Sequence, residues 1–241
     1  MKQIIKKPFI YFIIIVSVLF MDGCRKPYVA TPADKSSYGW ELYEKKDFIQ
    51  SKEWFYNSTI TAETWKDGYN GLGWSYANLL ELDSLDTENI GSIRTFHRGL
   101  TYPYPNNQIL YYDTPWQKTE KDVHLDILAG LTFAYHAKGN NSESVKHGNA
   151  LLDSTLIGLN PSRWVNWEFS HDSTLNYLDL RLTIASSYFA LAKFDSTHKH
   201  LKVVLDSLGS PNLLINDYST LLGKQKVAQQ LDSLQKVLQQ K

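Results

Sequence analysis

Hydrophobic positions recur at helical spacing towards the C-terminal end of this chain. Leu222, Val227, Leu231, Leu234 and Leu238 fall on one face of an expected helix over residues 220–240, and Gln and Lys residues occupy its other face. Such a helix can cap the open end of a helical array or offer its apolar face to a partner. The polar outer face favours the cap.

The middle of the chain carries a repeating pattern of small and aromatic residues. Gly39 and Gly73 are 34 residues apart, and each stands within a helical pattern. A glycine in a helix costs about 1 kcal/mol relative to alanine, so we expect a neighbouring helix to approach closely at these positions. After Gly39 the sequence predicts a turn at Asp47–Phe48, followed by a second helix with Ser51, Phe55 and Ser58 on its packing face.

One segment identifies the kind of repeat. Tyr69-x2-Leu72-Gly73-x2-Tyr76 resembles the W-x2-L-G-x2-Y signature of tetratricopeptide repeats, with Tyr in place of Trp. Residues 128–152 and 182–205 follow the pattern more loosely, the latter through Ala185 and Tyr188. The alternative is a helical bundle without repeats.

The resemblance implies an all-α, tetratricopeptide-like solenoid over residues 37–240, with about four irregular helical hairpins and a capping helix. The residues expected to pack these hairpins together are Gly39, Phe55, Leu72, Gly73, Tyr76, Ala185 and Tyr188.

Two inserts rich in aromatic residues interrupt the repeats, at residues 101–119 and 154–173. Both contain proline, which argues against a continuous helix. They either form an aromatic binding surface or fold back and pack their rings into a local core. Packing is favoured because long loops need apolar anchors to be ordered. The candidate binding residues are Tyr104, Tyr111, Tyr112, Trp116, Trp164 and Trp167.

The N-terminal segment has the layout of an export signal. Lys2, Lys6 and Lys7 precede an uncharged apolar run over residues 9–20, which is shorter than the roughly 20 residues of a membrane-spanning helix. Cys24, the only cysteine, follows shortly afterwards. An uncleaved anchor helix and an ordinary signal with a coincidental cysteine are the alternatives.

The residues around Cys24 resemble the lipobox of bacterial lipoproteins, although Asp22 stands where Ala or Ser is usual. The resemblance implies that residues 1–23 are removed, that Cys24 is acylated, and that the chain faces the periplasm from the outer membrane. Residues 24–36 are then expected to be a tether, with order beginning near Tyr38.

The charge balance and the missing catalytic motifs argue against nucleic-acid binding, metal binding and catalysis. Removal of residues 1–23 leaves 22 basic and 24 acidic residues, which gives no electrostatic reason to expect nucleic acid as a partner. The histidines lack the spacing of metal ligands, and no nucleophile elbow or phosphate-binding loop is present. We therefore expect no cofactor, no metal site and no enzymatic activity.

The leading hypothesis is a membrane-anchored, non-enzymatic scaffold that recognises a protein or peptide in the cell envelope. The alternative is a glycan-binding lipoprotein that uses the aromatic inserts, since tyrosine and tryptophan rings also stack on sugars. A purely structural spacer is a third possibility.

Overall fold

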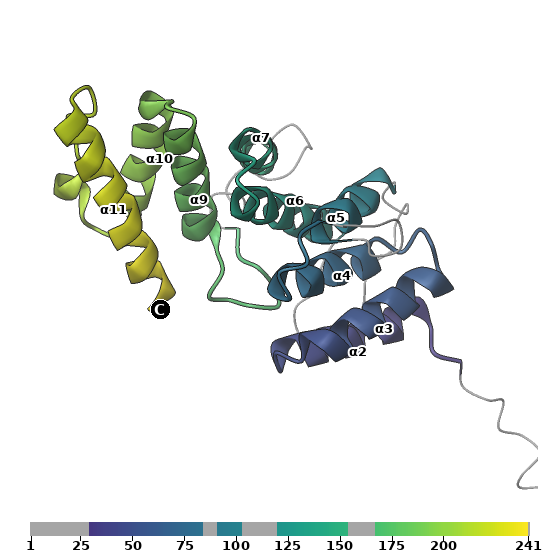
Figure 1. Ribbon diagram of the computed structural model, residues 1–241. Helices are drawn as coiled ribbons and strands as arrows, with labels where there is room; N and C mark the ends of the chain where they lie inside the picture. The colour runs from purple at the N-terminus through teal and green to yellow at the C-terminus, as the bar shows by residue number, and fades with distance from the viewer. Residues whose placement is uncertain (1–28, 84–90, 103–119, 154–166, 241) are drawn as a thin grey trace, which may run out of the picture. The chain divides into compact units, whose positions relative to one another are not determined.

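The computed structural model describes residues 29–83, 91–102, 120–153 and 167–240, and this part of the chain is built of packed α-helices (Figure 1). The helices are α2 (Pro32–Glu44), α3 (Phe48–Thr61), α4 (Lys66–Asn78), α5 (Ser92–Thr101), α6 (Glu120–Ala137), α7 (Asn141–Leu152), α9 (Tyr177–Ala190), α10 (Phe194–Ser207) and α11 (Leu221–Gln239). A 3-10 turn, Pro211–Leu213, lies between α10 and α11. The described residues contain no β-strand, which confirms the all-helical prediction.

All these helices belong to the unit Thr31–Lys241. Within it, α2 packs on α3, α4 on α5, α6 on α7 and α9 on α10 (Figure 1), and the second helix of each pair packs on the first helix of the next. In the described ranges, no helix combines the length and the apolar character needed to cross a membrane.

The first helix begins earlier than the sequence suggested. The Thr31 side chain accepts a hydrogen bond from the Asp34 N–H at 3.2 Å, and the Asp34 carboxylate accepts one from the Thr31 N–H at 2.8 Å. Pro32 at the first helical position has its φ already set for a helix. This capping box starts α2 inside the expected tether, which corrects the boundary placed at residue 36.

In three pairs, α2–α3, α6–α7 and α9–α10, the two helices are joined by the same tight turn. After α2, Lys46 takes φ +63°, its N–H donates to the Tyr43 carbonyl at 2.8 Å, and the Asp47 N–H donates to the Leu42 carbonyl at 2.9 Å. These bonds satisfy carbonyls that the end of a helix leaves without partners. Gly139 and Ala192 occupy the corresponding position in the turns after α6 and α9, with φ +80° and +56°.

A buried hydroxyl joins the two helices of three pairs at equivalent positions. The Ser51 hydroxyl donates to the Gly39 carbonyl at 3.0 Å, and Ser144 donates in the same way to Thr132 at 2.9 Å. Thr197 and the Ala185 carbonyl form the third example, at 3.4 Å. Each hydroxyl lies twelve residues after its acceptor, so the three pairs share one packing geometry.

Further hydroxyl contacts connect one pair to the next. Ser51 of α3 lies 2.9 Å from the hydroxyl of Ser75 in α4, and Ser187 of α9 donates to Ser144 of α7 at 3.0 Å. All four side chains are buried. Because buried hydroxyls are costly without partners, these contacts fix how successive pairs sit against each other.

Two phenylalanine rings are each enclosed by a pair of glycines. A Cβ on Gly39 would come within 3.0 Å of the Phe55 ring, and a Cβ on Gly71 would overlap the same ring. Phe96 is held in this way between Gly73 of α4 and a glycine of α6, and both rings are fully buried. The glycines thus provide the room for rings between neighbouring helices.

The C-terminal helix α11 packs against α9 through Val227, Leu231, Leu234 and Leu238. Leu222 was expected on this face, but 62% of its side chain is exposed. The buried face runs through Gly223 instead, four residues before Val227. Because adjacent helical positions point about 100° apart, Leu222 is turned away from this face. The expectation for Leu222 is therefore wrong by one position.

The enclosed rings predict a graded series of alanine substitutions. Gly73→Ala should lower the free energy of unfolding by about 1–3 kcal/mol, because the new Cβ would lie 2.5 Å from the Phe96 ring. Gly71→Ala should cost at least as much, since its Cβ would overlap the Phe55 ring. Gly39→Ala should be close to neutral, because its contact at 3.0 Å is offset by the better helix propensity of alanine.

Urea unfolding of the three variants measures these differences. The double variant Gly71→Ala with Phe55→Leu should recover part of the loss, since a smaller side chain makes room for the Cβ. Equal effects at all three glycines would contradict the prediction.

Candidate binding site

The described end of the second aromatic insert forms a small hairpin before α9. The Phe169 N–H donates to the Leu175 carbonyl at 2.9 Å, and the Tyr177 N–H donates to the Trp167 carbonyl at 2.7 Å. We call residues 167–177 the hairpin. Alternation along its first arm turns Trp167 and Phe169 inwards and leaves Glu168 and Ser170 exposed.

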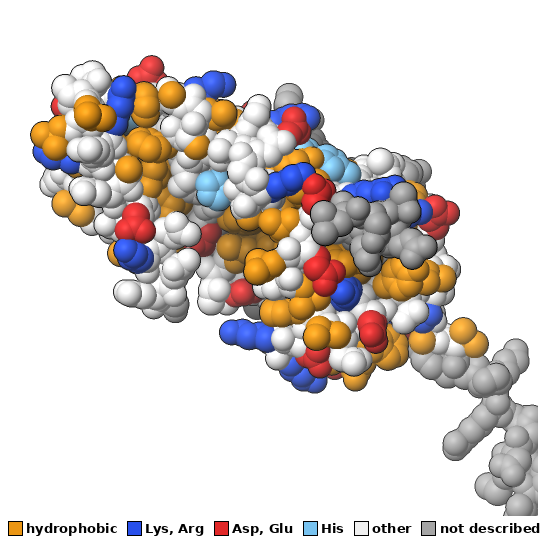
Figure 2. Space-filling view, viewed as in Figure 1, with side chains coloured by type: hydrophobic (Ala, Val, Ile, Leu, Met, Phe, Trp, Pro, Cys, Tyr) orange, Lys and Arg blue, Asp and Glu red, His pale blue; other side chains and the backbone are white. Residues whose placement is uncertain are grey.

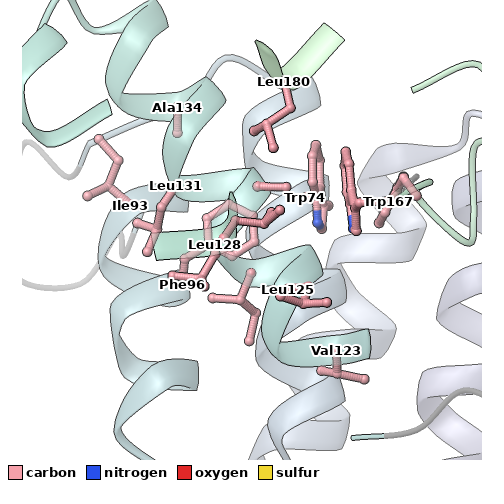
Figure 3. Packing of buried hydrophobic residues seen from close by; sticks show 14 of the residues in the cluster. Trp74, Ile93, Phe96, Val123, Leu125, Leu128, Leu131, Ala134, Trp167 and Leu180 are labelled. Carbon is pink, nitrogen blue, oxygen red and sulfur yellow. The ribbon is translucent and has the colours of Figure 1, made fainter. Parts of the chain in front are cut away.

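The inward rings of the hairpin enter an aromatic cluster formed by α2 and α4. Phe169 lies 4.4 Å from Trp74 and 6.0 Å from Trp40, measured between ring centroids. The His171 ring stacks on Trp40 at 3.6 Å with an angle of 6° between the planes. Figure 3 shows Trp74 and Trp167 in this cluster together with Leu125 of α6. The hairpin therefore covers side chains from the first helices of three pairs.

Two buried carboxylates fix the orientation of the indole rings. The Trp167 Nε1–H donates to Asp126 at 3.1 Å, and the Ser170 hydroxyl donates to the other oxygen of the same carboxylate at 3.3 Å. The Trp40 Nε1–H donates to Asp67 at 3.0 Å. Asp67 and Asp126 are both buried. Hydrogen bonds to charged acceptors are stronger than neutral ones, so these contacts set the position of the hairpin.

A longer-range contact ties the hairpin to the first helix. His171 Nδ1 lies 3.2 Å from the carboxylate of Glu44 at the end of α2. The hairpin thereby joins residues 127 positions apart in the sequence. The hairpin is therefore attached to α2 as well as covering side chains of α4 and α6.

The structure separates the candidate binding residues into two groups. Tyr104, Tyr111, Tyr112, Trp116 and Trp164 lie outside the described residues, as does Cys24. Trp167 is buried, so its ring is not offered to a ligand at the surface. The physical reason is its bond to Asp126 and its place beside Phe169 and Trp74. In the described part of this insert, the rings pack into a local core.

The expected packing residues all lie in helix contacts. Leu72 and Ala185 are buried, and Tyr76 packs partly buried against the larger hydrophobic cluster. The Tyr188 hydroxyl accepts a hydrogen bond from the Asn149 amide at 2.8 Å, which links α9 to α7. The sequence did not reveal Asp67, Asp126 or His171 as partners of these rings. Asp126 lies between Leu125 and Ile127 in an apolar stretch, which is a signal for a buried carboxylate, but only the fold shows which indole each of these residues meets.

One arrangement superficially resembles a nucleophile with its base. Ser187 Oγ lies 2.9 Å from Nδ1 of His136. Ser187 is fully buried and donates to Ser144, so its hydroxyl joins helices and faces no substrate. Among the residues that the structure describes, no three His, Cys, Asp or Glu side chains are grouped to hold a metal ion.

The structure contains an open pocket of about 460 Å³ between the start of α10 and the start of α11. Phe194, Asp195, Tyr218 and Lys224 line it. The Tyr218 hydroxyl donates to Asp195 at 2.8 Å, and the Lys224 ammonium lies 4.7 Å from the Phe194 ring centroid. These four groups thus form two pairs, and Lys193, Ser196 and Ser219 also line the pocket.

Replacing Trp167 with Phe tests the role of the buried carboxylate. Trp167→Phe should lower the free energy of unfolding by about 1–3 kcal/mol more than Trp74→Phe, because only the former removes a donor from a buried acceptor. Trp74 is a matched control: it is equally buried in the same cluster, and its Nε1 has no hydrogen-bond partner within the described residues. Equal losses in urea unfolding would show that the Asp126 bond contributes little.

Buried histidines predict a fall in stability in mild acid. Burial, with Arg181 and Lys199 nearby, lowers the pKa of His200 to about 4, and burial also lowers the pKa of His124 and of His147 to about 4. Since the unfolded chain binds these protons near pH 6.5, the unfolded state is favoured as the pH falls from 6.5 towards 4. This stability is fully present above pH 6.5.

His200→Gln should flatten that dependence by about 1–3 kcal/mol over the same range. Urea unfolding at a series of pH values measures the slope, with the variant compared to the unaltered chain. An unchanged slope would exclude a neutral, buried His200 as its source.

Comparison with known proteins found no similar chain. No family model matches, and neither a curated protein nor a solved structure does. The repeated helix pairs and the hairpin-covered aromatic cluster are therefore the observations from which a function has to be argued.

Proposed function

We propose that this chain is a membrane-anchored helical-repeat scaffold of the bacterial cell envelope, which binds a protein or peptide partner and catalyses no reaction. The observation that carries the proposal is the recurrence of one packing geometry. Three helix pairs share the same left-handed turn and the same buried bond from a hydroxyl to a carbonyl twelve residues earlier. Stacked pairs of this kind provide an extended surface for recognition.

The tetratricopeptide-like assignment draws support from the glycines. Gly39 and Gly73 occupy equivalent positions in their pairs, and each faces the aromatic ring of a neighbouring helix. The resemblance in sequence and the close approach in space concern the same residues. This agreement supports the proposal of a tetratricopeptide-like architecture.

The hairpin covers one face of the helical unit and so limits where a partner could bind. Its rings fill the face formed by α2, α4 and α6, while Glu168, Ser170, Asp172 and Ser173 are exposed. A partner on this side of the molecule would meet a polar and acidic surface. We propose this outer surface of the hairpin as the recognition surface, because a rigid support reduces the entropy lost on binding.

The anchor is proposed from the sequence around Cys24. An acyl chain on this thiol would hold the scaffold at a membrane, since each buried methylene contributes about 0.8 kcal/mol. Anchoring raises the local concentration of the scaffold for partners in the same envelope.

Crosslinking and pull-down of the tagged full chain from envelope extracts test the proposal. The unaltered chain should incorporate a palmitate analogue and recover one stoichiometric envelope protein. Glu168→Lys with Asp172→Lys should lose that protein, because the variant reverses the charge of the hairpin surface. Asp232→Lys, a charge reversal at an exposed position of α11, should retain it.

Cys24→Ser should abolish the acyl label. An unlabelled chain of the unaltered sequence would refute the anchor. Equal recovery of the partner by both charge variants would refute the hairpin as the recognition surface, and binding to glycans instead of a protein would favour the alternative function.

A further inference from the structure

The outer side of α3 carries an exposed apolar stripe. Ile49, Tyr56 and Ile60 are 60%, 53% and 63% exposed. At 100° per residue they fall within about 40° of one another on the helix, over a length of about 16 Å. The opposite side of α3 is buried through Ser51, Phe55 and Ser58. Figure 2 shows hydrophobic side chains at the surface over α3, among charged ones.

The stripe ends beside the start of the first helix. The Ser58 hydroxyl donates to the Pro32 carbonyl at 2.8 Å, and the Lys35 ammonium donates to the Thr61 hydroxyl. The Ile60 end of the stripe therefore lies at the same level along α3 as the first turn of α2, where the helical unit begins, although Ile60 faces away from α2. The chain from Cys24 to Thr31 spans at most about 25 Å when fully extended. A lipid on Cys24 would keep this end of α3 near the bilayer.

The size of the stripe decides between possible occupants. Three side chains offer far less than the roughly 800 Å² per partner of a stable protein interface, so a second copy would bind too weakly from solution. A tethered chain needs less, because it has already lost most of its translational freedom. Tyr56 also has the character of residues that lie at the lipid–water boundary, with an apolar ring and a polar hydroxyl.

The charges around the stripe are arranged at its edges. Lys45 and Lys46 are exposed in the turn before α3, at the Ile49 end, between two exposed carboxylates: Glu44, which contacts His171, and Asp47, which accepts from the Gln50 N–H. Glu53 lies about 40° to one side of Ile49, and Lys52 lies on the other side, paired with Glu81. The lysines at the end can reach lipid phosphates, while Glu53 can stay in water.

We infer that the Ile49–Tyr56–Ile60 stripe rests on the phospholipid bilayer and orients the helix pairs relative to the membrane. This inference rests on the proposed anchor at Cys24.

Fluorescence of a single label tests the contact. Cys24 is the only cysteine, and its thiol is blocked when acylated, so Ile60→Cys can be labelled alone with an environment-sensitive dye. The acylated full chain is placed in phosphatidylethanolamine–phosphatidylglycerol vesicles with or without brominated acyl chains. The emission at residue 60 should shift to the blue and lose intensity with brominated lipid. Val237→Cys, 49% exposed on α11, is the control and should do neither.

The outcomes separate the inference from the proposed anchor. A chain that floats with vesicles but shows no quenching at residue 60 overturns the docking and leaves the anchor standing. Quenching at both residues shows unspecific contact and also overturns it. A blue shift that depends on protein concentration, without lipid quenching, identifies a second copy as the occupant and overturns it. Flotation of the Cys24→Ser chain equal to that of the unaltered one refutes the anchor, and the inference with it.

Discussion

Phe55 lies between a glycine of α2 and a glycine of α4, and this close approach of backbone to ring governs the rest of the helical unit. The ring fills the space that a Cβ on Gly71 would occupy, and it lies only 3.0 Å from where a Cβ on Gly39 would be. The same arrangement recurs one pair later around Phe96. The spacing between the first helices of successive pairs is therefore set by aromatic rings, and the small hydroxyl residues can reach across only because the helices are this close.

The hairpin depends on that spacing. It contacts α2 through Trp40, α4 through Trp74 and α6 through Asp126, so these three helices must present their side chains at matching depths. If the glycines did not bring the helices together, Phe169 would have no continuous apolar surface to cover. Glycines where the helices cross are a local feature of the sequence. They nevertheless determine a contact between parts of the chain that are distant in sequence.

The sequence reveals these features to different degrees. The turn at Asp47 and the glycines at 39 and 73 are predictable because each is a local signal with a fixed spacing. The start of α2 was also predictable, since Thr31 and Asp34 have the spacing of a capping box, but Pro32 and the small polar residues around it favoured a tether. Packing of the insert rings was the favoured interpretation of the sequence, but the acceptor of the Trp167 N–H was not predictable, because it lies on α6, 41 residues earlier. A sequence pattern can indicate that a ring is buried. It cannot indicate which carboxylate accepts the hydrogen bond from that ring.

The polar atoms within the aromatic cluster have a specific consequence. The ring contacts of Phe169 and His171 already favour particular orientations, and the polar atoms add a second, directional set of contacts. Bonds from an indole and a hydroxyl to the two oxygens of Asp126 tie the hairpin to α6, because a shift of the hairpin would stretch or break both. The hairpin is then held in one position, and its exposed residues have a fixed geometry. A surface of few polar side chains can recognise a partner only if they keep such a geometry, so the buried aspartate matters to recognition without touching the partner.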